Sequence, residues 1–144
     1  MSRTLSLFVA LVCLCATNPL SAQKVSPVEA MQCAGNYMTS VSKNRLKSTG
    51  TAPARHRFSL ASAAVSGPDT LYYVLNDSVN NAFVILSADK RCRPVLGYSD
   101  AAIFNLENQP VAFTGWMKGR EKEIAHIITQ IPTPDPVYEQ QWTL

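Results

Sequence analysis

The chain has 144 residues, of which 47% are hydrophobic and 16% are charged, and its formal net charge is +3. It is too short for a (β/α)8 barrel or for a doubly wound dehydrogenase with a separate substrate domain. It is also too apolar and too weakly charged to be intrinsically disordered, so we expect one globular domain.

The first 22 residues have the pattern of a secretory signal peptide. Arg3 supplies a positive charge, residues 5–16 form an uncharged and largely apolar run, and Pro19 and the small residues Ser21 and Ala22 follow. The run is shorter than the roughly 20 residues that a membrane-spanning helix needs. We therefore predict cleavage after Ala22 and a secreted or periplasmic chain with no stable membrane anchor.

The mature chain opens with the signals of a helix start. Ser26 can cap a helix, Pro27 suits its first turn, and Glu29 stands three residues after Ser26, as in a capping box. Apolar residues then recur at spacings of three and four. This pattern predicts a helix over residues 27–46 and a loop over residues 47–55.

Basic side chains gather near this first helix. Residues 23–60 contain six Lys or Arg residues and one acidic residue, whereas residues 61–144 contain six basic and nine acidic residues. We interpret residues 43–57 as a solvated basic loop, with a surface for an acidic partner as the alternative. Nucleic acid is not an expected partner, because no aromatic-rich basic stripe accompanies the charges.

The middle of the chain is typical of short strands joined by polar turns. Aromatic and β-branched runs predict strands at residues 57–60, 71–75, 82–87 and 94–99. The turn between the second and third of these strands is rich in Asn and Asp, which tolerate left-handed backbone conformations.

A second amphipathic helix is expected after a further loop. Apolar residues recur on one helical face over residues 110–131, Asn108 can serve as the N-cap, and Pro110 suits the first turn. Three prolines follow closely, so residues 132–144 are expected to form an extended Pro-rich tail or linker.

The order of these elements predicts an α+β fold over residues 23–131. Strands joined by tight turns pair antiparallel, which gives an antiparallel sheet of three to four strands packed against two flanking helices. We expect both helices to cover the same face of the sheet, in two layers.

Few residues carry recognisable chemistry. Cys33 and Cys92 remain after signal cleavage, and they are interpreted as two packed thiols, with a disulfide or a catalytic nucleophile as the alternatives. His56 is expected to be a solvated loop residue and His126 a partly buried helix residue. No motif for a metal or a cofactor is present, so neither is expected.

One segment has a more specific pattern. Residues 82–91 (AFVILSADKR) and 94–100 (PVLGYSD), followed by Phe104, resemble the signature of the streptopain prodomain family, which includes Spi-type protease inhibitors. The resemblance implies an antiparallel sheet flanked by helices. It also implies a partner, a papain-like cysteine protease whose cleft the domain occludes and whose catalytic His it holds away from the catalytic Cys.

The resemblance also implies which residues reach the protease. The family presents a Glu-Asn pair in the loop before its last helix, and Glu107 and Asn108 are the matching pair here. We therefore predict that four residues of this loop contact the protease: Asn105, Glu107, Asn108 and Gln109.

The resemblance ends where a zymogen would continue into its protease domain. The expected function is therefore that of a secreted, prodomain-like inhibitor acting on a separate streptopain-type protease, and the chain itself is not expected to be an enzyme. Two alternatives stay open. The chain could be the truncated propeptide of a zymogen without its catalytic domain, or an exported module that binds another surface through residues 43–57.

Overall fold

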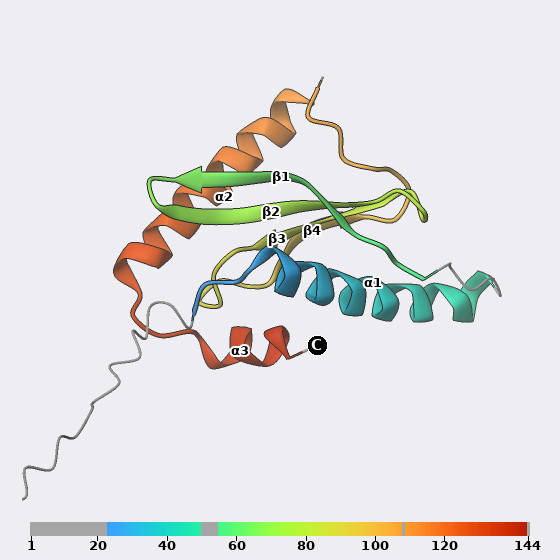
Figure 1. The fold of residues 1–144 in the computed structure, drawn as a ribbon, viewed down its shortest axis with the longest axis horizontal. Helices are drawn as coiled ribbons and strands as arrows, with labels where there is room; N and C mark the ends of the chain where they lie inside the picture. Colours follow the sequence, from blue (N-terminus) through green and yellow to red (C-terminus); the bar gives the residue numbers. More distant parts are fainter. Residues whose placement is uncertain (1–22, 50–54, 108, 144) are drawn as a thin grey trace, which may run out of the picture.

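The computed structural model describes residues 23–49, 55–107 and 109–143. Within them, four strands and three helices follow one another along the chain (Figure 1). Their bounds are α1 (Pro27–Thr49), β1 (Ser59–Ser66), β2 (Asp69–Asp77), β3 (Ala82–Ser87), β4 (Val95–Ser99), α2 (Val111–Gln130) and α3 (Pro136–Trp142).

The strands form one antiparallel sheet in the order β1-β2-β3-β4. Each strand pairs with the next along the chain, as tight connections require. Gly67, with a φ of 57°, makes the β1–β2 turn possible, and Asn81, with a φ of 51°, serves the turn before β3. The predicted α+β class with an antiparallel sheet is confirmed.

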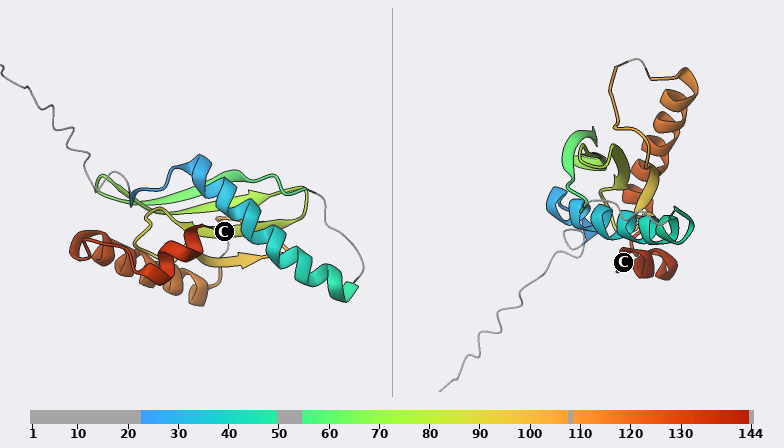
Figure 2. Two further views of the ribbon diagram at one scale, coloured as in Figure 1. Left: turned by 90° about the horizontal axis from the view of Figure 1, so that it is seen from below. Right: turned by 90° about the vertical axis from the view of Figure 1, so that its right-hand side faces the viewer.

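The two long helices lie on opposite faces of the sheet, so the prediction of two layers was wrong. The α1 face of the sheet is formed by Tyr73, Leu75, Val84 and Leu86, and they pack with Ala30, Ala34 and Met38 of α1. The α2 face is formed by Tyr72, Val74 and Ile85, and they pack with Met117 and Ile124 of α2. Figures 1 and 2 show the sheet between α1 and α2.

The reason for three layers is visible in the central strands. Five consecutive residues of β2, residues 71–75, are buried, and β3 is buried at residues 84–87. Successive side chains of a strand point to opposite faces, so an uninterrupted buried run requires cover on both sides. The uninterrupted apolar runs in the sequence already carried this information.

Most elements were predicted within a few residues. Both long helices and β3 match their predicted ranges closely, and Ser26 caps α1 by accepting a hydrogen bond from the Glu29 N–H at 3.2 Å. β1 runs to Ser66, well beyond the predicted residues 57–60. The prediction stopped short because the Ala- and Ser-rich sequence of this strand has weak strand propensity and little alternation.

The prediction of an extended tail was also wrong for residues 136–142, which form α3. The Asp135 side chain caps this helix by accepting from the Val137 N–H at 2.8 Å, and Pro136 occupies its first turn. Trp142 packs against the core next to α1, and its indole N–H donates to the Cys92 carbonyl at 2.9 Å. The limits of the domain stay predictions, and residues 1–22 lie outside the described residues.

A buried ion pair in the turn after β3 joins that turn to the end of α2. The guanidinium of Arg91 donates from Nε and Nη2 to the Asp89 carboxylate, at 2.8 and 2.7 Å. Its Nη1 donates to the carbonyls of Ile128 and Ile131, both at 2.9 Å, and so binds the end of α2. The two side chains are 3% and 1% exposed.

The N-terminal segment is fastened at the same place. The Val25 N–H donates to the Ala88 carbonyl at 2.9 Å, and the Lys90 N–H donates to the Gln23 carbonyl at 2.8 Å. The Ser87 hydroxyl closes the turn by donating to the Arg93 carbonyl at 2.8 Å. The segment VILSADKR, which carried the family resemblance, is therefore a structural junction.

None of the helices in the described ranges is long and apolar enough to cross a membrane.

Replacing Arg91 by Ala is expected to lower the free energy of unfolding by about 3 kcal/mol, because it leaves the buried Asp89 carboxylate and two helix carbonyls without their donor. Urea denaturation measures this loss. Arg93→Ala is the matched control, because the Arg93 residue is exposed, and it should change the free energy by less than about 0.5 kcal/mol. Equal effects of the two variants would contradict the structural role of Arg91.

Candidate functional site

The predicted site residues lie on the segment between β4 and α2, residues 100–110, which we call the β4–α2 loop. Asn105, Glu107 and Gln109 are described, and the structure brings them together on this loop. Asn108 lies outside the described residues. Residues 100–107 and the first turns of α2 rise away from the rest of the molecule in the right-hand view of Figure 2.

Two asparagines from the far end of the β2–β3 hairpin hold the stem of the loop. The Asn76 side chain pairs with the backbone of Phe104, donating to its carbonyl at 2.9 Å and accepting from its N–H at 2.8 Å. The Asn81 amide donates to the Ala101 carbonyl at 2.6 Å. The loop therefore begins from a fixed position relative to the sheet.

A series of packed aromatic rings joins the loop to the sheet and to α2. The Phe104 ring centroid lies 5.5 Å from that of Phe83 on β3 and 5.8 Å from that of Phe113 on α2, and Phe113 in turn lies 5.7 Å from Trp116. Ring pairs at such separations are each worth about 0.5–1.5 kcal/mol beyond the area they bury. Phe104, which belongs to the family signature, therefore ties the loop to β3 and α2.

The polar side chains of the loop bond to the loop itself. The Asn105 carboxamide oxygen accepts from the Glu107 N–H at 2.9 Å, and the Gln109 amide donates to the Asn105 carbonyl. Two of the four predicted contact residues therefore set the shape of the loop. Pro110 is the N-cap residue of α2 and makes no side-chain capping hydrogen bond, and the predicted cap, Asn108, lies outside the described residues.

The two described cysteines are both buried and unpaired, which confirms the interpretation as packed thiols. Burial raises the pKa of Cys33, with a contribution from Glu29, and burial raises the pKa of Cys92 to about 12, with a contribution from Asp89. Both thiols are protonated at neutral pH, and a thiol is a much weaker nucleophile than a thiolate.

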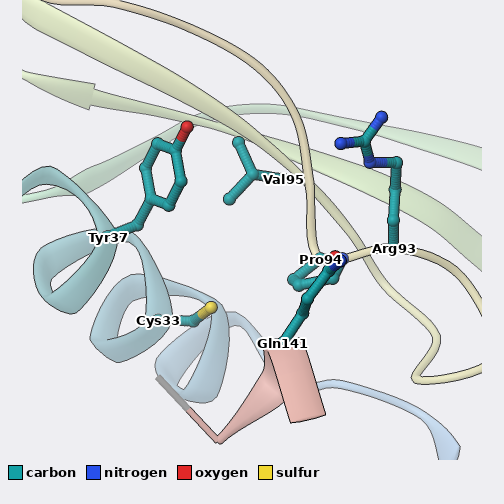
Figure 3. Close-up of a pocket in the computed structure, with 6 residues that line it drawn as sticks. All are labelled: Cys33, Tyr37, Arg93, Pro94, Val95 and Gln141. Carbon is teal, nitrogen blue, oxygen red and sulfur yellow. The ribbon is translucent and has the colours of Figure 1, made fainter. Parts of the chain in front are cut away.

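Cys33 lines a pocket of about 180 Å³ between α1, β4 and α3 (Figure 3). Cys33 and Tyr37 on α1 face Pro94 and Val95 across it in the close-up. The pocket lies in the α1 layer and is formed by elements other than the β4–α2 loop.

His56 is mostly buried, so its prediction as a solvated loop residue was wrong. Its side chain is 7% exposed, its Nδ1 lies 2.7 Å from the Asp77 carboxylate, and its Nε2 lies 3.3 Å from the Ser42 hydroxyl. These partners are 21 and 14 residues away in the chain, and sequence pattern alone gives no signal for such distant pairs. His126, predicted to be partly buried, is exposed on α2.

The contacts of Asp77 show what the cluster of Ser42, His56 and Asp77 does in the fold. Its carboxylate also accepts hydrogen bonds from the N–H groups of Val79 and Asn80 and from the Asn80 amide. Burial alone would raise the pKa of Asp77, but the hydrogen bonds from Asn80 and His56 and from the backbone outweigh it and hold the pKa below its usual value. Ser42, His56 and Asp77 therefore fasten α1 to the β2–β3 turn, and Asn81 in that turn holds the stem of the β4–α2 loop.

In the described ranges, no three His, Cys, Asp or Glu side chains gather in a way that could hold a metal ion.

The comparisons with known proteins agree with the resemblance seen in the sequence. A family model described as Spi protease inhibitor matches residues 22–124. A thiol protease/hemagglutinin, PrtT, of Porphyromonas gingivalis is 27% identical to this chain over 125 residues, which cover 86% of the chain and 14% of that protein. No solved structure matches the chain significantly.

Asn76→Ala is expected to loosen the β4–α2 loop, because it removes both hydrogen bonds to Phe104. The free energy of unfolding should fall by about 1–2 kcal/mol, and the amide proton of Phe104 should exchange faster with solvent. Hydrogen exchange followed by NMR measures the second effect. Ser78→Ala, at an exposed position of the neighbouring turn, is the control and should leave that amide unchanged.

Asp77→Asn is expected to destabilise the fold by about 1–3 kcal/mol at pH 6 and by less at low pH. Because the folded pKa of Asp77 is depressed, its contribution is complete above the unfolded pKa of about 3.9 and is lost as the pH falls through the folded value. Urea denaturation of wild type and variant between pH 6 and pH 2 measures the difference. A difference that does not shrink at low pH would contradict this assignment, and Glu139→Gln, an exposed carboxylate, is the control.

Proposed function

Because the chain belongs to the Spi protease inhibitor family, we propose that it is a secreted, prodomain-like inhibitor of a streptopain-type thiol protease. Family membership supports a protease inhibitor or propeptide role. The proposal adds the site, the β4–α2 loop, and the mode of action, which is occlusion of the active-site cleft by binding and without chemistry of the chain's own.

The observation that carries the proposal is the fixed, projecting β4–α2 loop. Asn76 and Asn81 hold its stem, and Phe104 anchors it within the ring series. A loop that is ordered before binding loses little conformational entropy in the complex, so more of its contact energy contributes to affinity. An inhibitor that occupies a cleft needs a segment of this kind.

Occlusion also accounts for the loss of protease activity in chemical terms. In papain-like proteases, to which the streptopain family is similar, the catalytic Cys is activated by a His that helps to form the thiolate. A domain that holds this His away from the Cys leaves a protonated and weakly nucleophilic thiol. The same binding mode would also keep substrate out of the cleft.

Export is part of the proposal. Residues 1–22 would act as the signal peptide, with cleavage near Ala22, and so would bring the inhibitor to the compartment of a secreted protease.

The second candidate function is that of a propeptide acting on a protease in its own chain. The match to the Porphyromonas gingivalis thiol protease supports it, because the matched segment covers only 14% of that much longer protein. The contacts with the protease would be the same in both cases. The two functions differ in whether the purified chain inhibits a separate protease, which the following titration measures.

The purified chain, residues 23–144, is expected to inhibit a purified streptopain-type protease domain with 1:1 stoichiometry and to form a complex on size-exclusion chromatography. Replacing residues 105–109 by five glycines should weaken inhibition by at least about 100-fold, because a flexible loop must be ordered on binding. The control replaces Ser78 and Val79 in the β2–β3 turn by glycine and should inhibit like the wild type. Neither inhibition nor a complex at micromolar concentration would refute the trans-acting inhibitor.

A further inference from the structure

The loop presents apolar side chains to solvent on the segment that we propose as the protease-contacting site. Ile103 is 48% exposed, Leu106 is 64% exposed and Val111, the first residue of α2, is 89% exposed. Single exposed hydrophobic residues are common on protein surfaces. Three of them within nine residues of a projecting segment are not scattered in this way.

Resting on the function proposed above, we propose that the β4–α2 loop and the first residue of α2 bind the protease through an apolar anchor made of Ile103, Leu106 and Val111. Leu106 enters an apolar pocket of the active-site cleft, and its two neighbours cover the rim of that pocket. The polar residues Asn105 and Gln109 hold the loop in shape and contribute little direct contact energy.

The hydrogen bonds within the loop show why the polar residues shape the loop and the apolar residues are free to bind. The Asn105 and Gln109 side chains are both used by the loop backbone, at the Glu107 N–H and the Asn105 carbonyl. These bonds fix the orientation of the two amides, so neither can turn toward a protease without breaking its bond to the loop. Leu106 lies between the two in the chain, and its exposed side chain belongs to neither of the two core clusters.

The support below the anchor is rigid. Phe104 stands between Ile103 and Asn105 in the chain, with its backbone held by Asn76 and its ring packed between Phe83 and Phe113. Ile103, the residue before Phe104, is therefore held in place relative to the sheet. Preorganised apolar anchors that fill a pocket are the features that dominate binding energy in protein interfaces.

A protease fits this surface better than a second copy of the chain does. From Ser99 to Met117 the sequence carries Asp100 and Glu107 and no Lys or Arg. Two copies meeting through this segment would bring like charges together, which opposes association. The surface matches a partner whose apolar pocket has a neutral or basic rim.

The test compares inhibition constants against one streptopain-type protease. Leu106→Asp is expected to weaken inhibition by at least 100-fold, because it places a charge in an apolar pocket. Leu106→Met keeps the volume and the apolar character and should stay within about 5-fold of wild type. Val65→Asp is the matched control, since Val65 is 69% exposed on β1, and it should stay within about 3-fold.

The outcomes separate the anchor from the function on which it rests. If the wild type inhibits and Leu106→Asp inhibits equally well, the anchor is refuted while the inhibitor function stands. If the wild type itself does not inhibit, the proposed function fails first. If sedimentation shows that the wild type dimerises and Leu106→Asp is monomeric, a second copy occupies the surface and the proposal is overturned. Circular dichroism and thermal unfolding show that each variant is folded.

Discussion

The buried pair of Asp89 and Arg91 is the interaction on which the rest of the structure depends. A guanidinium withdrawn from water is tolerated only when its N–H groups find acceptors, and Arg91 finds them on Asp89 and on two carbonyls at the end of α2. The same turn receives the N-terminal segment through the backbone of residues 23–25. Three parts of the chain that are distant in sequence thus meet at one charge pair.

This arrangement explains why the family resemblance rests on residues that are unsuited to binding a partner. Residues 84–89 are buried, and Asp89 and Arg91 satisfy each other within the fold. The signature residues therefore indicate the fold of the domain and do not mark its binding surface. Recognition is proposed for the β4–α2 loop, where side chains are exposed and where only Asp100 and Phe104 belong to the signature.

Local signals predicted most of the fold. Ser26, Pro27 and the apolar spacing that follows define α1, and the run at residues 82–87 defines β3, because caps and periodicity depend on neighbouring residues. The layer arrangement was missed although the uninterrupted apolar runs of β2 and β3 indicate cover on both faces of the sheet. The helix α3 and the burial of His56 were missed because each depends on distant contacts, Trp142 on the Cys92 carbonyl and Asp77 beside the imidazole. The loop was located through the resemblance, but the self-bonding of Asn105 and Gln109 depends on a backbone geometry that no residue pattern specifies.

The helix α2 connects these two ends of the molecule. Its last turn is bound by Arg91, and its first turns carry the exposed loop, with 20 residues between its bounds. At 1.5 Å per residue this helix is about 30 Å long, so a tilt of about 5° about its C-terminal end moves the far end by roughly 2.6 Å. A displacement of a few tenths of an ångström where Arg91 binds the end of α2 therefore becomes a larger displacement at Val111, the first residue of the helix. Substitutions around Arg91 can consequently displace the start of α2, and with it Val111 of the apolar anchor, while Asn76 and Asn81 still hold the stem of the loop.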